Sequence, residues 1–397
     1  MKTIYFDNAA TTPVHPAVLT AMKPYFNTAY GNPSEFHALG RKAKISLEKA
    51  RTNVAKFLGA KSQEIVFTGS ATESINLSHK GLIEAIQGDF HGTQKPHIIT
   101  SVIEHSAVLE TCRHLQRTNA ATVTYLPVDR FGVISLEKLK KAIRPTTVLV
   151  SCMYVNNEIG TIEPIPKIGS LIRRLNHAGR KHRIYFHTDA TQAIQYLPCD
   201  VKVLGVDLLS FTGHKIYAPK GIGALFVKQD TPLVRQLDGG GQESNFRSST
   251  ENIPYIVGLG KAITLIHKSK KQTILRTTRL RNILIKEIAA IPGITLTGHP
   301  EKRVPHIVSC VVSGVEGEAM ILHLSDAGIM ASSGSACTSA RLDPSHVLTA
   351  IGISQELAHG SLRFSIGKNT TARDVTRVIK KLSVIIEKLR LMAPEFN

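Results

Sequence analysis

A lysine at position 215 follows an apolar run and has the surroundings of a reactive amine. Residues 206–211 have the pattern of a buried strand in a parallel sheet, which ends at the small and polar residues Thr212, Gly213 and His214. The carboxyl ends of parallel strands usually carry the binding and catalytic groups of α/β proteins. A lysine that is partly desolvated there can lose its proton and form an imine with an aldehyde cofactor. Taken alone, Lys215 also fits an ordinary surface lysine after a strand.

A second short apolar segment, residues 184–187, is followed by the carboxylate of Asp189. A buried aspartate can pair with the ring nitrogen of pyridoxal phosphate and keep it protonated, so that the ring accepts electrons. Gln192 is placed to hydrogen-bond the phenolic oxygen of that ring. The alternative is that Asp189 caps the next helix. An aspartate strand followed closely by a lysine strand is the more specific pattern.

Three further segments follow predicted strands and add polar groups. Residues 67–74 end a strand and open a helix, so that backbone N–H groups near Ala71 and the hydroxyl of Thr72 can bind a phosphate; the same residues also fit a capping box. His105 follows the strand at 97–101 and either stacks on a ring or serves a structural role. Asn157 follows the strand at 148–153 and offers an amide, although Asn-rich turns often have no further function.

The composition is that of a large enzyme without a membrane anchor. The chain has 397 residues, of which 42% are hydrophobic, enough for a large core in two domains. No apolar run approaches the roughly 20 residues that cross a bilayer, and the amino terminus has no signal-peptide core. Five scattered cysteines with no metal-binding spacing favour a reducing, cytoplasmic location and no metal site: Cys112, Cys152, Cys199, Cys310 and Cys337.

The formal net charge of +19 favours acidic partners. The basic residues are dispersed over helices, however, no nucleic-acid-binding motif accompanies them, and aromatic residues make up only 6% of the chain. We therefore interpret the excess as a solvated basic face and do not expect direct nucleic-acid binding.

The apolar pattern alternates between helical and extended periods, which predicts an α/β fold with a mostly parallel sheet covered on both faces. A smaller α/β segment follows from about Lys261, with a basic helix over 273–290 and a last helix after residue 374. The predicted strands are residues 64–67, 97–101, 123–127, 148–153, 184–187, 206–211 and 223–227. The domains we expect are an amino-terminal segment (1–14), a large cofactor-binding domain (15–261) and a small domain (262–397).

Taken in order, these motifs resemble the cysteine desulfurases of the class V aminotransferase group, which are fold type I pyridoxal-phosphate enzymes. The similarity covers nearly the whole chain. It begins at residues 5–13 and 31–34, continues through the segments above, and includes residues 239–243, 247–250, 333–338 and 361–365. The resemblance implies a fold type I architecture, a large domain with a mostly parallel sheet and a smaller carboxyl-terminal domain.

The resemblance also implies a role for each matched residue. Lys215 would hold pyridoxal 5'-phosphate covalently and carry protons, Asp189 would pair with the ring nitrogen, and Gln192 would contact the ring oxygen. His105 would stack on the ring, with Asn157 beside the cofactor and substrate. Arg363 would bind the substrate carboxylate, a role that suits a two-pronged donor. The residues implied at the phosphate are Ala71, Thr72, Thr212 and His214, with Thr250 from the second subunit of a homodimer.

Cys337 would carry the distinctive chemistry of such an enzyme. Residues 332–341 are small and polar, which is typical of a surface loop rather than a segment that buries an inert thiol. Its thiolate would attack the sulfur of L-cysteine, giving L-alanine and a persulfide for a sulfur-acceptor protein, either an iron–sulfur scaffold or a relay to tRNA thiolation. The alternative is an incidental exposed cysteine.

Several departures from the family pattern bear on these expectations. Ala218 and Ser249 replace glycines, which matters only where a positive φ is needed. The chain ends at Asn397 without the longer tail of assembly-type enzymes, which leaves the scaffold partner open. The long Ser/Gly-rich loop makes a dedicated selenocysteine lyase a weaker alternative. Other pyridoxal-phosphate aminotransferases or lyases are further alternatives. A basic binding protein without catalysis is the alternative from another class.

Overall fold

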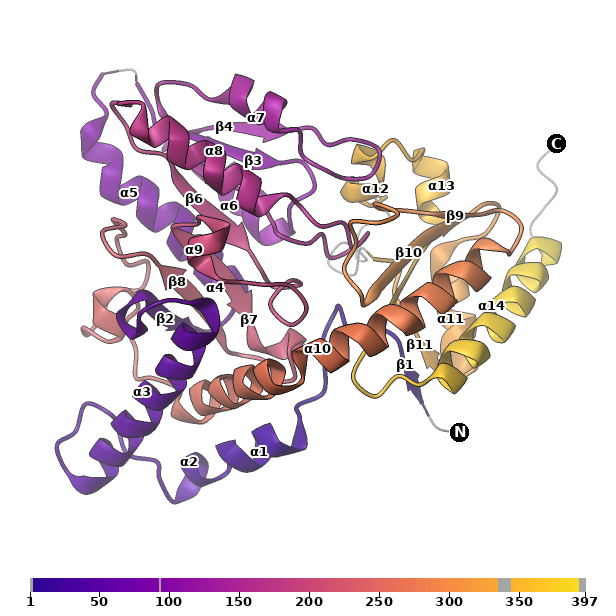
Figure 1. Ribbon diagram of the computed structural model, residues 1–397, viewed down its shortest axis with the longest axis horizontal. Coiled ribbons are helices and arrows are strands. Elements are labelled where there is room, and N and C mark those ends of the chain that lie inside the picture. Colours follow the sequence, from indigo (N-terminus) through magenta and orange to yellow (C-terminus); the bar gives the residue numbers. More distant parts are fainter. Residues whose placement is uncertain (1–2, 93, 335–343, 393–397) are drawn as a thin grey trace.

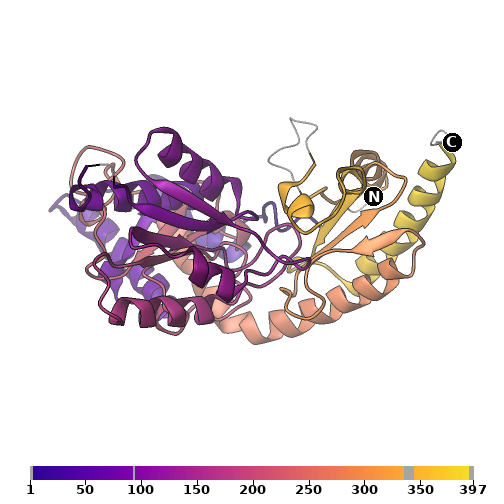
Figure 2. The same ribbon diagram turned by 90° about the horizontal axis from the view of Figure 1, so that it is seen from above.

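The computed structural model describes residues 3–92, 94–334 and 344–392, so the predicted Cys337 lies outside the described residues. Two sheet-containing parts lie side by side and share the long helix α10 (Ile253–Ala289) (Figure 1). Figure 2 shows α10 passing from the larger part into the smaller one.

The larger part is built on a seven-stranded sheet in the order β2-β8-β7-β6-β5-β3-β4. Only β8 runs antiparallel to its neighbours, β2 and β7, so the expectation of a mostly parallel sheet is confirmed. The strands are β2 (Ile65–Thr68), β3 (His97–Ser101), β4 (Thr122–Leu126), β5 (Thr147–Ser151), β6 (Tyr185–Asp189), β7 (Leu208–Thr212) and β8 (Gly223–Val227).

Helices cover both faces of this sheet, because successive strand residues point to opposite sides. Ile98 and Leu149 pack with side chains of α4 (Ala71–Asn76), α5 (Leu82–Ile86) and α6 (Ser106–Arg117). The neighbouring residues Ile99 and Val150 face the other core, with α8 (Ile165–His177), α9 (Val201–Leu204) and α3 (Ala38–Leu58). Helix α3 ends at Gly59, whose φ of 67° is the left-handed conformation that favours glycine.

The smaller part contains the antiparallel sheet β12-β10-β9 and a two-stranded parallel sheet of β1 and β11. Helices α10, α11 and α14 pack around these strands through one apolar core. The elements are β1 (Ile4–Tyr5), β9 (Ile294–Leu296), β10 (Ile307–Val312), β11 (Ile329–Met330), β12 (Ser361–Ser365), α11 (Gly317–Asp326), α12 (His346–Ala350), α13 (Gln355–His359) and α14 (Ala372–Met392).

Helix α10 belongs to both cores. Ile256, Leu259 and Ile263 in its first half pack with the large sheet, whereas Leu280 and Leu284 in its second half pack with the small one. The helix expected from residue 273 is therefore the second half of a 37-residue helix, and the expected boundary at residue 261 falls inside it. The remaining α-helices of the described residues are short: α1 (Pro16–Met22), α2 (Pro24–Asn27) and α7 (Leu136–Ala142).

The amino-terminal segment links the two parts. Asp7 forms a bridge with Ser365 of β12, and a few residues later the N–H of Thr12 donates to the carbonyl of His214, 2.8 Å away, beside Lys215. Residues 7–12 therefore run from the small sheet to the turn that carries the lysine. Among the described helices, none combines the length and apolar character that crossing a bilayer requires.

Candidate active site

A cavity of about 240 Å³ lies at the carboxyl ends of the parallel strands, where the sequence analysis predicts the catalytic residues. It brings together residues from six separate segments of the chain, and Ala10 is one of them. The predicted residues that line it are Ala71, Thr72, His105, Asn157, Asp189, Gln192, Thr212, His214 and Lys215.

Asp189 and Lys215 reach the cavity from adjacent strands. Asp189 ends β6 and lies opposite Ser210 of β7, while Lys215 closes the short 3₁₀ turn Gly213–Lys215 that follows β7. A Cβ at position 213 would lie 2.7 Å from Cγ2 of Ile222, so this turn accepts only glycine without a shift. Asp189 is 6% exposed, and its Oδ1 accepts the N–H of Thr191 at 2.9 Å. No helix follows there: residues 191–196 form turns, so Asp189 does not cap a helix as the alternative required, and its Oδ2 remains for another partner.

The histidines around the lysine are held in the neutral state. Burial lowers the pKa of His105, and the positive charge of Lys215 lowers it further, against an opposing effect of Asp189. Burial, together with Lys215 and Lys220, lowers the pKa of His214 to about 4. His105 Nδ1 also accepts the N–H of Ala107 at 3.1 Å and caps α6. A neutral imidazole presents an uncharged face to a ring in the cavity.

The start of α4 also lines the cavity. The hydroxyl of Ser70 accepts the N–H of Glu73 at 3.1 Å and caps the helix, so Ala71 and Thr72 occupy the first turn, where N–H groups remain for an anion. Glu73 is fixed by the N–H of Gly69 at 2.7 Å and by Arg247 at 2.8 Å. The capping interpretation and the anion-binding interpretation are therefore compatible.

Gln192 has two partners that the sequence analysis did not identify. Its Nε2 donates to the carbonyl of Ala9 at 2.9 Å, and its Oε1 accepts from Nε2 of His306 at 3.0 Å. His306 is buried, its ring is stacked on Tyr196 at a centroid distance of 4.2 Å, and burial lowers its pKa to about 3. A neutral histidine thus orients the glutamine from 114 residues away.

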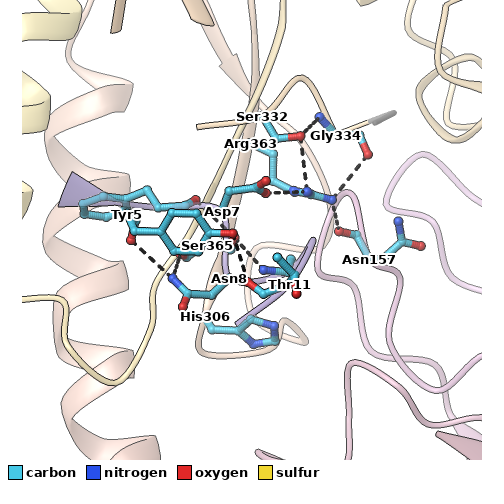
Figure 3. A network of polar contacts seen from close by, with 12 residues as sticks. Tyr5, Asp7, Asn8, Thr11, Asn157, His306, Ser332, Gly334, Arg363 and Ser365 are labelled. Carbon is cyan, nitrogen blue, oxygen red and sulfur yellow. Dashed lines mark hydrogen bonds and ion pairs between the residues drawn. The ribbon is translucent and has the colours of Figure 1, made fainter. Parts of the chain in front are cut away.

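Arg363 lies beside the cavity, next to Asn157, and its guanidinium is densely bonded (Figure 3). Nη1 donates to the carbonyls of Asn157 at 2.9 Å and Gly334 at 3.3 Å. Nη2 donates to Asp7 Oδ1 at 2.9 Å and Ser332 Oγ at 3.3 Å. Nε is buried without a hydrogen-bond partner within the described part of the chain. The ion pair with Asp7 is a second contact that the sequence analysis missed.

Thr250 does not line the cavity of Lys215. It borders a separate hollow of about 220 Å³, together with Gly69 and Arg247. The preceding strap, residues 243–249, is strained: Glu243, Ser244 and Asn245 have φ of 47°, 56° and 68°.

The two glycine replacements have different outcomes. Ser249, where the family has glycine, has a φ of 112°, so that replacement is strained. Ala218 is not among the residues with positive φ, whereas its neighbour Tyr217 has a φ of 65°. The alanine therefore causes no backbone strain.

The strap is fixed to α3 and β2 by a buried ion pair. Both carboxylate oxygens of Glu243 accept from Arg51, at 2.7 and 2.8 Å, and Oε2 also accepts the N–H of Phe67 at 2.8 Å. Arg51 donates in addition to the carbonyl of Ile65 at 2.7 Å. These contacts and the Glu73–Arg247 pair join the strap to β2 and the start of α4.

Every cysteine that the structure describes is buried. Burial raises the pKa of Cys112, Cys199 and Cys310 to about 12 and that of Cys152 well above its usual value. These four thiols are therefore protonated at neutral pH and inert as nucleophiles.

Comparison with known proteins places the chain in a family. It matches the family described as aminotransferase class-V over residues 4–378. A cysteine desulfurase IscS from Dictyoglomus turgidum is 45% identical over 394 residues, 99% of this chain and 97% of that protein. A cysteine desulfurase IscS from Methanosarcina thermophila is 45% identical over 393 residues, 99% of this chain and 94% of that protein.

Two solved structures extend the similarity to the fold. A NifS-like protein superposes with a TM-score of 0.89 at 35% identity, covering 98% of this chain and 100% of the other. The structure of SspA in complex with cysteine superposes with a TM-score of 0.79 at 38% identity, covering 92% and 99%. Since both the sequence and the fold match along nearly the whole chain, this protein belongs to the class-V aminotransferase family, whose cofactor is pyridoxal phosphate.

Proposed function

We propose that this protein is a cysteine desulfurase, which converts L-cysteine to L-alanine and passes the sulfur to an acceptor. The observation that carries the proposal is the pairing of Lys215 and Asp189 in one cavity, with an arginine beside it. The cysteine desulfurases that are 45% identical over 99% of the chain support the choice of reaction.

The residues of the cavity fit pyridoxal phosphate. The buried hydroxyl of Thr191 lines the cavity and has no hydrogen-bond partner among the described residues. A buried polar group of this kind can bind a polar atom of a ligand. We assign Lys215 to the aldehyde end, Asp189 to the ring nitrogen, Gln192 to the ring oxygen and His105 to the ring face. Those assigned to the phosphate are Ala71, Thr72, Thr212 and His214. When bound, the cofactor supplies an electron sink for the bond changes in the substrate.

The remaining steps fall to side chains of the chain itself. Arg363 and Asn157 hold and orient the substrate carboxylate, a role that suits the planar, two-pronged guanidinium. Lys215 moves protons at the substrate through Nζ. Neutral His105 holds the ring and excludes water from that face.

We assign the sulfur transfer to Cys337, whose thiolate attacks the sulfur of the substrate and becomes a persulfide. The inert state of Cys112, Cys152, Cys199 and Cys310 supports this assignment, because a thiolate is the nucleophile.

We also propose a homodimer in which Thr250 of one subunit completes the phosphate site of the other. Its position outside the cavity of Lys215 in the single chain supports this arrangement. The acceptor is a protein of iron–sulfur assembly or tRNA thiolation. The proposed domains remain residues 1–14, 15–261 and 262–397.

The test mixes purified protein with cysteine and a reductant and quantifies alanine and sulfide together. We expect equal amounts of both from the wild type, and neither from Cys337→Ala, which keeps the absorbance of the bound cofactor. Lys215→Ala should lose the reducible covalent adduct with the cofactor. Cys199→Ala is the matched control, because it removes a buried thiol outside the site. Unchanged alanine release by Cys337→Ala would refute the sulfur-transfer role and favour another class V enzyme, such as a selenocysteine lyase.

A further inference from the structure

The guanidinium of Arg363 already holds a carboxylate of the chain. Asp7 Oδ1 lies 2.9 Å from Nη2, and the arginine and aspartate side chains are 3% and 21% exposed. The other terminal N–H groups are directed at Ser332 and at the carbonyls of Asn157 and Gly334 (Figure 3). A substrate carboxylate must therefore share this arginine with Asp7 or displace one of its partners.

The backbone around Asp7 is held in place on both sides, so its carboxylate can leave Arg363 only by rotation of the side chain. The N–H of Phe6 donates to Met330 of β11 at 2.8 Å. On the other side, the side-chain Nδ2 of Asn8 donates to the carbonyl of Ser365 of β12, also at 2.8 Å. Asp7 itself forms a bridge with Ser365, two residues from Arg363 on the same strand. Strand pairing therefore fixes the backbone of Asp7 beside the arginine, and the hydrogen bond to Nη2 orients its carboxylate.

A fixed carboxylate affects the site in two opposite ways. Its hydrogen bond orients the guanidinium, which favours binding of any carboxylate ligand. Its negative charge offsets that of Arg363 and repels a second carboxylate on the same fork. For two carboxylates about 5 Å apart at an effective dielectric constant of roughly 20 to 80, this repulsion weakens binding at least several-fold.

We propose that Asp7 sets the affinity of the site for the substrate carboxylate by sharing Arg363 with it. This inference rests on the proposed function, in which Arg363 binds that carboxylate. Asp7 is a positioning residue that aligns the arginine. Its negative charge also weakens the binding of the substrate and product carboxylates, so that both can dissociate. Removing the charge while keeping an acceptor should separate the two effects.

The test compares the wild-type holoenzyme with Asp7→Asn, in which an amide oxygen can still accept from Nη2. The probe is 3-mercaptopropionate, which has the carboxylate and thiol of cysteine but no amine, and its Kd is measured by isothermal titration calorimetry. We expect Asp7→Asn to lower this Kd at least several-fold. Cysteamine, which has no carboxylate, should bind both proteins with the same Kd.

The matched control is Asp230→Asn. Asp230 is exposed and follows β8 at Val227, at the far end of the strand from Gly223, which pairs with Thr212 beside the site. This variant removes the same charge and should leave both dissociation constants unchanged. If Asp7→Asn does not fold, Asp7→Ser also removes the charge and keeps an acceptor.

The possible outcomes separate this inference from the proposed function. An unchanged or higher Kd for 3-mercaptopropionate in the charge-removed variant overturns the role of Asp7, as does an equal shift for cysteamine. Alanine release from cysteine by the wild type is measured in parallel. If the wild type releases none, the proposed function is overturned, whatever the value for Asp7→Asn.

Discussion

The ion pair of Arg51 and Glu243 should be a strongly coupled element of the structure. Their side chains are only 10% and 2% exposed, and three hydrogen bonds end on the carboxylate. Removing one partner of such a buried pair costs about 3–5 kcal/mol, because the remaining charge is left uncompensated. Glu243→Gln should cost about 3 kcal/mol, the lower end of that range, since Arg51 keeps its bond to the carbonyl of Ile65 and its ion pair with Glu48.

A double-mutant cycle measures this coupling. Arg51→Met should cost a similar amount, because Glu243 then keeps only the N–H of Phe67. In the double variant no charge is left unpaired, so its total cost should be lower than the sum of the two single costs by about 2–3 kcal/mol. Free energies of unfolding come from urea titrations of the cofactor-free protein at one fixed concentration. Amide hydrogen exchange at Phe67 provides a local readout, which should accelerate in both single variants. Additive costs, or an unchanged exchange rate at Phe67, would refute the reasoning.

Three further changes have distinct expected results. Ser249→Gly should raise the melting temperature, because glycine relieves strain of about 1 kcal/mol at a φ of 112°; Ser249→Ala, which keeps the strained φ, should not raise it. Burial raises the pKa of Glu104 from 4.5 to about 8, so its proton is bound more tightly in the folded state, and stability should fall as the pH rises from about 4.5 to 8. Glu104→Gln should flatten this dependence in unfolding titrations at pH 5 and pH 8, and an equal slope in both proteins would contradict the assignment. His306→Phe keeps a ring against Tyr196 but loses the hydrogen bond to Gln192, so cofactor should dissociate several-fold faster on dilution; an unchanged rate would mean that Ala9 alone orients the glutamine.

The strands were predictable because each is a short apolar run bounded by polar residues. Residues 97–101 and 223–227 coincide with β3 and β8, and the other strands of the large sheet are displaced by at most two residues at either end. Helix α10 was cut short because residues 267–276 are largely exposed where the helix passes between the two cores, so the apolar period is interrupted. The helix continues through these residues because both of its ends pack on a core, which the local apolar pattern does not show.

The residues of the site were predictable where they follow a strand end. Asp189 and Lys215 carry this signal, and the parallel sheet brings them together. His306 carries no such signal, and its contact with Gln192 spans 114 residues. The ion pair of Asp7 and Arg363 joins residues 356 positions apart and depends on the bridge to β12, which a single sequence does not reveal.

The pairing of β1 with β11 and of Asp7 with Ser365 has a consequence for synthesis on the ribosome. The seven strands of the large sheet are complete once residue 227 has emerged, so that sheet can form while the chain is still growing. The first strand must wait until about a hundred further residues have left the exit tunnel. Residues 4–7 are therefore among the last to find their partners, whereas Thr12 and His15, which bond the turn that carries the lysine, need only the large part of the protein.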